Sequence, residues 1–103
     1  VAPASGNTMA KLANDIIDGT APMAVKSHLR KERPVVIAIS TNNGLSGAAV
    51  NIGKLLNMRH YYFVPFGQDN PITKPRSLVF KPEMLIKTIE SALDGEQIEP
   101  IIL

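Results

Sequence analysis

The sequence predicts an α/β fold: a three-layer, Rossmann-like or flavodoxin-like parallel sheet flanked by helices. Short apolar runs rich in β-branched residues, such as 35–39, indicate strands that are covered on both faces, as in parallel sheets. Amphipathic helical segments alternate with these runs, which favours right-handed crossovers between parallel strands. Ligands bind at the carboxyl ends of the strands in such folds, so the loops that follow the strands are the first candidates for a site.

Length and composition indicate one domain and exclude several classes of function. The 103 residues are 45% hydrophobic and 19% charged, which fits a single folded unit. The net charge is +2, and no basic stripe is interleaved with aromatic residues, which argues against nucleic-acid binding. The chain has no cysteine for a disulfide framework, a thiolate metal site or a catalytic thiol, which fits the cytoplasm. No run of residues predicts a transmembrane helix or a signal peptide.

The first residues predict the end of a strand followed by the start of a helix. Val1-Ala2-Pro3 resembles the last residues of a buried strand, so we expect the C-terminal part of a longer fold that lacks its N-terminal strands and helices. Apolar residues at 9, 12, 13, 16 and 17 predict a helix that ends near Asp18-Gly19. Ser5-Gly6-Asn7-Thr8 then lies at a helix N-terminus, where free N–H groups and the helix dipole favour an anion. The same residues are also preferred helix caps, so capping alone is the alternative.

A second strand-loop-helix unit follows. A helix is predicted at about 21–32, and His28 on its inner face is interpreted as a packed histidine rather than a catalytic one. Pro34 ends this helix, and the strand 35–39 leads into the polar loop 40–47 and a helix of about 47–57. Both this loop and the loop at 3–8 follow strands and precede helices. We therefore expect the two loops to open on the same edge of the sheet and to share one ligand.

The C-terminal third continues the alternation. Tyr61–Val64 predicts a strand, and Pro65–Leu78 predicts a long irregular loop because of its prolines and glycine; such loops are more often functional than filler. The charged residues of this loop, Asp69, Lys74 and Arg76, are interpreted as solvated rather than as ligand contacts. The last helix is predicted at 82–93, and the apolar tail 101–103 should pack on the body or on another subunit. The inward-facing residues of that helix should be Leu85, Ile86, Ile89 and Leu93.

One motif resembles a known family. Ala2-Pro3-Ala4-Ser5-Gly6-Asn7-Thr8 is similar to the PASANT motif of the homo-oligomeric flavin-containing cysteine decarboxylases, with Gly6 in place of the second alanine. The resemblance implies that Ala4, Ser5, Gly6, Asn7 and Thr8 bind flavin mononucleotide (FMN). The family's second motif, PAMN, falls at Ile39-Ser40-Thr41-Asn42, where only the asparagine is kept, which argues against cysteine decarboxylation. The catalytic histidine of the family would lie upstream of these residues, so no catalytic residue is assigned.

Segments 2–14, 33–43 and 62–69 resemble one branch of this family more closely, and the resemblance covers essentially the whole chain. It implies a subunit that supports NADP-linked oxidation of dihydrodipicolinate to dipicolinate in the mother-cell cytoplasm of a sporulating bacterium. It also implies a homo-oligomer and a partner, the A subunit, through which NADP would bind. Ser40, Thr41, Asn42 and Asn43 are expected to bind the small dicarboxylate, since it needs hydrogen-bond donors at both ends. The alternatives are an FMN-dependent decarboxylase of a cysteinyl substrate and a non-catalytic assembly subunit with the same fold.

Overall fold

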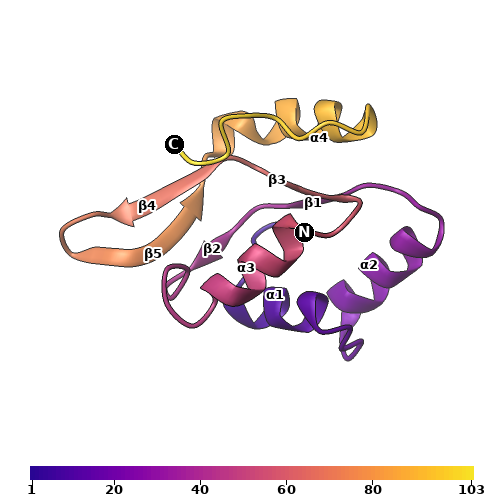
Figure 1. Ribbon diagram of the computed structural model, residues 1–103, viewed down its shortest axis with the longest axis horizontal. Helices are drawn as coiled ribbons and strands as arrows, with labels where there is room; N and C mark the ends of the chain where they lie inside the picture. Colours follow the sequence, from indigo (N-terminus) through magenta and orange to yellow (C-terminus); the bar gives the residue numbers. More distant parts are fainter.

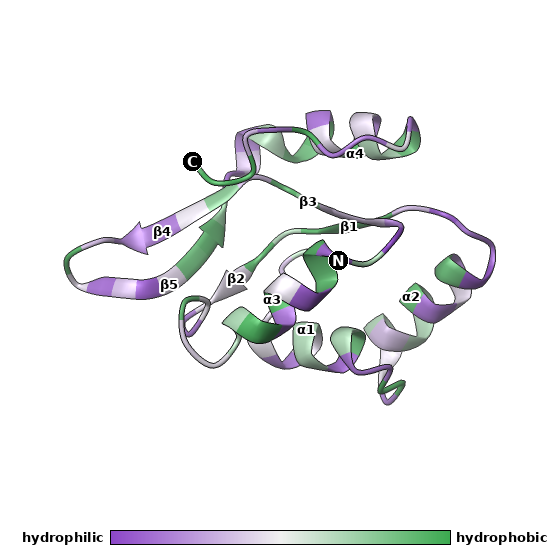
Figure 2. Ribbon diagram, viewed as in Figure 1, coloured by the Kyte–Doolittle hydropathy of each residue, from purple (hydrophilic) through white to green (hydrophobic).

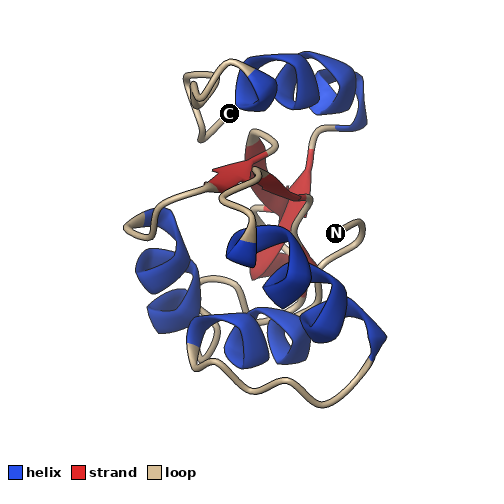
Figure 3. Cartoon of the chain, turned by 90° about the vertical axis from the view of Figure 1, so that its right-hand side faces the viewer, coloured by secondary structure: helices blue, strands red, loops and turns tan.

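The computed structural model describes residues 1–103 and arranges them in three layers (Figures 1 and 3). One outer layer is formed by α1 (Gly6–Ala13), α2 (Thr20–Arg30) and α3 (Ala49–Leu56). The other is formed by α4 (Leu85–Leu93), which follows a 3-10 turn at Pro82–Met84. The strands between them are β1 (Val35–Ile37), β2 (Ser40–Thr41), β3 (Tyr61–Phe63), β4 (Phe66–Asn70) and β5 (Lys74–Phe80). The predicted α/β fold with parallel strands is confirmed.

The parallel sheet is built on β1 and β3. These strands pair in register from Val35 opposite Tyr61 to Ile37 opposite Phe63. On the other edge of β1, Ala4 forms a parallel bridge with Ile39, so the residues before α1 lie beside β1. Segment 1–4 and β1 therefore run in the same direction, and both lead into polar loops at the carboxyl edge of the sheet.

The free edge of β3 is satisfied by a side chain instead of a strand. The amide of Gln97 accepts a hydrogen bond from the Phe63 N–H at 2.8 Å and donates one to the Phe63 carbonyl at 2.7 Å. Farther along, the N–H of Phe66 donates to the Ile101 carbonyl, and the N–H of Leu103 donates to the Phe66 carbonyl. Of the tail that was predicted to pack on the body or on another subunit, Ile101 packs against the core, whereas Ile102 and Leu103 are 73% and 53% exposed.

The prediction of an irregular loop at 65–78 is wrong, because β4 and β5 form an antiparallel hairpin that projects from the sheet (Figure 1). Pro71 lies in the turn, and Pro75 lies beside a register shift between Gln68 and Asn70, so neither proline removes a ladder hydrogen bond. The base of β5 also pairs with β2, which joins the hairpin to the loop after β1. Much of the outer half of the hairpin is hydrophilic, and its base is hydrophobic (Figure 2).

Two helix predictions are corrected at α1 and α2. The first helix ends at Ala13 rather than near Asp18, because Asn14 turns its side-chain amide back to the Ala10 carbonyl at 2.7 Å. Asp15 then adopts a φ of 55°, the left-handed conformation that ends helices and that Asp tolerates better than most residues. His28 is exposed rather than packed, since α2 buries its other face.

The predicted inner face of α4 is also wrong in part. The helix buries Thr88 and Ala92 against the strands, whereas Ile86 is 65% and Leu93 is 72% exposed. Apolar periodicity identifies the amphipathic helix but does not say which part of a wide apolar face is covered. In this chain α4 is the only helix on its side of the sheet, so its outer apolar residues have no neighbour to pack against.

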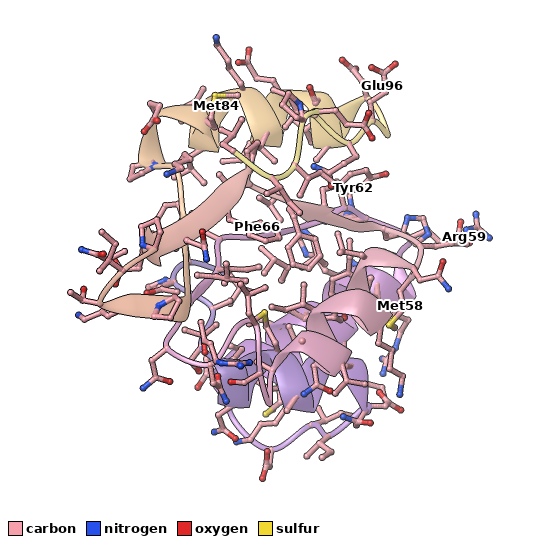
Figure 4. All side chains as sticks on the ribbon, turned by 60° about the vertical axis from the view of Figure 1, so that its left-hand side comes forward. Met58, Arg59, Tyr62, Phe66, Met84 and Glu96 are labelled. Carbon is pink, nitrogen blue, oxygen red and sulfur yellow. The ribbon has the colours of Figure 1, made fainter.

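The hydrophobic core lies between the sheet and the layer of α1, α2 and α3. Figure 4 shows Tyr62 between β3 and α4 and Phe66 on the opposite side, toward the larger helical layer. The rings of Phe63 and Phe66 pack with centroids 6.2 Å apart, as aromatic pairs prefer. The other core residues are Ala4, Met9, Leu12, Ala13, Val25, Val35, Ile37, Ile39, Ile52, Leu55, Tyr61 and Leu78.

The burial of Tyr61 makes stability dependent on pH in the alkaline range. Burial raises the pKa of the Tyr61 hydroxyl above its ordinary value, and the carboxylate of Asp15 raises that pKa further. The unfolded chain therefore loses this proton first, and the free energy of unfolding should fall as the pH rises from about 10 toward the raised pKa. Urea unfolding at a series of alkaline pH values measures the slope. Tyr61→Phe should flatten it, and Asp15→Asn should flatten it less; an unchanged slope in Tyr61→Phe would contradict the assignment.

Candidate functional site

The first polar loop caps α1 and leaves donors free. The Ser5 hydroxyl accepts a hydrogen bond from the Thr8 N–H at 3.2 Å and donates one to Thr8 Oγ1 at 3.1 Å. Ala4 is fully buried beneath the loop. The Asn7 side chain is exposed, and no group within the chain accepts from the backbone N–H groups of Gly6 and Asn7. The predicted cap is therefore present, and Gly6 and Asn7 still offer donors at a helix N-terminus.

The second polar segment begins as a strand rather than a loop, because Ser40 and Thr41 form β2. The Thr41 hydroxyl donates to Asn43 Oδ1 at 2.6 Å. The Asn43 carbonyl accepts from the N–H groups of Ser46 and Ala48, so Asn43 holds the turn that leads into α3. Asn42 is exposed, and its side chain makes no hydrogen bond within the chain. The two asparagines therefore differ: Asn43 is occupied with the loop, and Asn42 is free.

The two segments meet at Gly6. A Cβ at this position would lie 3.0 Å from Asn43 Oδ1 and 3.1 Å from Thr41 Oγ1. Both distances are shorter than ordinary carbon–oxygen contacts, so a side chain here would push the segments apart. The absence of a side chain at Gly6 therefore lets the loop before α1 approach Thr41 and Asn43.

Together the segments line one cleft of about 570 Å³ at the carboxyl edge of the sheet. This volume lies within the range of roughly 300–1,000 Å³ that is usual for small-molecule sites. Ser5, Gly6, Asn7, Ser40, Thr41, Asn42 and Asn43 line the cleft, with Asp69, Ser77, Leu78 and Val79 from the hairpin. Of the residues expected to bind a ligand, only Ala4 and Thr8 lie outside the lining.

The hairpin forms a wall of the cleft and is fastened to the loop after β2. The Arg76 guanidinium donates to the Leu45 carbonyl at 3.1 Å, and the Leu45 N–H donates to the Arg76 carbonyl at 3.0 Å. The Ser77 hydroxyl donates to the Thr41 carbonyl at 3.2 Å. Arg76 is exposed, as interpreted from the sequence, and its guanidinium also joins two parts of the fold.

Asp69 is the one acidic residue in the cleft, and sequence reasoning missed its position. Its carboxylate lies 3.9 Å from the Lys74 ammonium in an exposed pair on the hairpin, which contributes little to stability. An anionic group should therefore bind at the α1 side of the cleft, away from Asp69. Only recognition of the β4–β5 hairpin could have revealed this placement, because the hairpin puts Asp69 beside Ser77 of β5, which bonds to Thr41 of β2.

The structure offers neither a metal site nor a membrane span. No three or more His, Cys, Asp and Glu side chains come close enough to hold a metal ion. None of the helices is long and apolar enough to cross a membrane.

Fold and cleft define a class: an α/β protein of Rossmann-like type with a small-molecule cleft at the carboxyl edge of its sheet. No protein-family model matches the chain. The chain is 45% identical over 103 residues to the B subunit of dipicolinate synthase of Bacillus subtilis (strain 168), and the match covers 100% of this chain and 52% of that protein. The crystal structure of the dipicolinate synthase B subunit from Bacillus halodurans C matches with a TM-score of 0.96 and 46% identity over 99% of this chain and 52% of that chain.

Both comparisons confirm the resemblance that segments 2–14, 33–43 and 62–69 predict, and the proteins that the chain resembles are B subunits of dipicolinate synthase. The chain spans about half the length of each of these two proteins.

Proposed function

We propose that the chain is part of a B-type subunit of dipicolinate synthase, which supports NADP-linked oxidation of dihydrodipicolinate to dipicolinate. The observation that carries the proposal is the similarity to the B subunit along the whole chain, with 45% identity and a TM-score of 0.96. The structural match covers 99% of this chain, so it includes the elements that line the cleft. The partner would be the A subunit, which we propose carries NADP.

The donors of the cleft fit a planar dicarboxylate. Asn7 with the N-terminus of α1 offers donors on one side, and Asn42 offers a free amide on the other. Hydrogen bonds to a carboxylate are stronger than those between neutral groups, so one such donor at each end can fix the ring in a single orientation. We propose that these residues bind and orient the substrate, and that Ser40, Thr41 and Asn43 support them from β2 and the following turn.

FMN is the alternative ligand that we propose for the α1 side of this cleft, in place of the substrate carboxylate. The free N–H groups of Gly6 and Asn7 fit its phosphate, because they lie at the N-terminus of α1 and have no acceptor within the chain. The flavin ring fits less well, since Leu78 and Val79 are the only apolar residues of the cleft, so surfaces outside these residues would hold it. Bound FMN would supply redox chemistry, and the residues of this chain would supply the binding of its phosphate.

The test is to combine the full-length protein with the A subunit, dihydrodipicolinate and NADP and to follow dipicolinate by its ultraviolet absorbance. Activity that needs both subunits supports the proposal. An A subunit that is equally active alone would contradict the proposal and favour an assembly role for this protein. Carbon dioxide release from a cysteinyl substrate would instead favour the decarboxylase. Yellow flavin that copurifies with the protein supports the FMN proposal and argues against the non-catalytic assembly role.

Asn7→Asp should weaken binding of an anionic ligand by about 1–3 kcal/mol, because a carboxylate would replace a donor of similar shape. Stability should not fall, since an acidic residue in the first turn of α1 suits the helix dipole. Calorimetric titration with dipicolinate measures the affinity, and urea unfolding measures the stability. Asn57→Asp, on an exposed residue after α3, is the matched control for the change in net charge. Equal affinities of the two variants would leave Asn7 with no ligand role.

We also propose that the full-length protein is a homo-oligomer. Ile86, Ile89 and Leu93 lie at helical spacing on α4 and are 65%, 37% and 72% exposed, and such an apolar patch often marks an interface with another protein surface. Such assemblies are commonly symmetric. Sedimentation of the full-length protein at micromolar concentration tests the proposal, and a monomer would contradict it.

A further inference from the structure

A second cavity lies between α1 and α2, at the opposite end of the sheet from the polar cleft. It has a volume of about 370 Å³, and Tyr61, the first residue of β3, forms part of its lining. The adjoining helices are visible at the lower side of Figure 1. The walls are mainly apolar: Leu12, Ile16, Ile17, Pro22, Val25 and Leu29. Ile16 and Ile17 reach the cavity because α1 ends at Ala13 and the chain turns back at Asp15.

Two cations without partners lie at the rim. Lys26 and Arg30 are one helical turn apart on α2, so both face the same side, and neither forms a salt bridge. Lys11 also lines the cavity, but its ammonium lies 3.1 Å from the Asp18 carboxylate. An apolar cavity with free positive charges at its mouth is attractive to an anion with an apolar body, because each part of the ligand finds a matching environment.

The inner wall carries one polar group without a partner. The Tyr61 side chain is 7% exposed, and its hydroxyl, which makes no hydrogen bond within the chain, is the part that solvent reaches. This hydroxyl is therefore open to the cavity and can donate a hydrogen bond to a ligand there. Asp15 is the only acidic residue in the lining, and it opposes an anion less strongly than Lys26 and Arg30 attract one.

We propose that this cavity binds a planar aromatic anion, that is, a ring system that carries one carboxylate or sulfonate. The ring lies between the apolar faces of α1 and α2, the charged group faces Lys26 and Arg30, and the Tyr61 hydroxyl donates to a polar atom of the ligand. The site is separate from the polar cleft in position and chemistry, so it does not depend on the proposed oxidation of a dicarboxylate.

The probe is 8-anilinonaphthalene-1-sulfonate, an aromatic monoanion whose fluorescence rises in apolar surroundings. It is titrated into the full-length protein at low and high salt. Changing Lys26→Gln and Arg30→Gln together should raise the dissociation constant about tenfold at low salt and less at high salt. Tyr61→Phe should weaken binding several-fold. Asp15→Asn should tighten it several-fold, and an unchanged urea-unfolding midpoint of this variant excludes a partly unfolded state, which also binds the probe, as the cause of the gain.

The matched control changes Lys31→Gln and Lys87→Gln together, which removes the same net charge from exposed residues outside the cavity. Benzoate should displace the probe, and benzyl alcohol at the same concentration should not. The proposal is overturned if the control weakens binding as much as the Lys26 and Arg30 variant, if Asp15→Asn leaves affinity unchanged, or if neither pair of changes matters. The last result would place the probe on another apolar surface, such as the exposed face of α4.

Discussion

Asn42→Ala is expected to lower the rate of dipicolinate formation by about 10- to 100-fold while leaving stability unchanged. The side chain lines the cleft and makes no hydrogen bond within the chain, so its removal costs the fold nothing. A hydrogen bond to a charged group contributes roughly 1.5–3 kcal/mol, and a tenfold change in rate corresponds to about 1.4 kcal/mol. Steady-state rates with the A subunit, together with urea unfolding of each variant, separate the effect on the reaction from the effect on the fold.

Two other asparagines sharpen this test. Asn57→Ala removes an exposed amide outside the cleft and should change neither the rate nor the stability. Asn43→Ala removes the acceptor of the Thr41 hydroxyl and should lower the free energy of unfolding by about 1 kcal/mol as well as the rate. A wild-type rate in Asn42→Ala would remove the substrate role that we assign to this residue.

Sequence periodicity located most of the elements that build the cleft. Unbroken apolar runs identified β1 and β3, because a strand that is buried on both faces is apolar at every position. Helical spacing identified α1 and α3, because a helix that is buried on one face is apolar only at every third or fourth position. The order strand, loop, helix then placed both polar loops at one edge, and the structure brings them into one cleft. These predictions succeeded because each depends on local pattern plus the handedness of crossovers.

The errors concern tertiary context. Prolines at 71 and 75 argued against a hairpin, since sequence alone does not show that one falls in a turn and the other beside a bulge. Asp69 was missed as part of the cleft for the same reason. On α4 the apolar pattern is real, but exposure of Ile86 and Leu93 depends on what else lies on that side of the sheet. Pattern gives the identity of an element, and its neighbours decide which side chains are covered.

The contact between the hairpin and the loop before α3 depends on Gly44. A Cβ at Gly44 would lie 2.5 Å from Leu78 Cδ1 and 2.6 Å from Leu78 Cγ, and Leu78 is a buried core residue of β5. Gly44→Ala should therefore destabilise the protein by about 1–3 kcal/mol, the usual cost of overpacking a well-filled core. The same displacement moves the hairpin wall away from Asn42, so dipicolinate affinity should fall with stability.

Gly53 provides the matched control. It lies within α3, and nothing lies within 4 Å of a Cβ added there, so Gly53→Ala should stabilise the protein by about 0.5–1 kcal/mol through helix propensity. Combining Gly44→Ala with Leu78→Ala should cost less than the sum of the two single changes, because the shortened side chain leaves room for the new methyl group. Urea unfolding of the four proteins in this cycle should give a coupling of about 0.5–3 kcal/mol. Additive effects would mean that Gly44 and Leu78 do not compete for space, and that the hairpin is held to the loop by its hydrogen bonds alone.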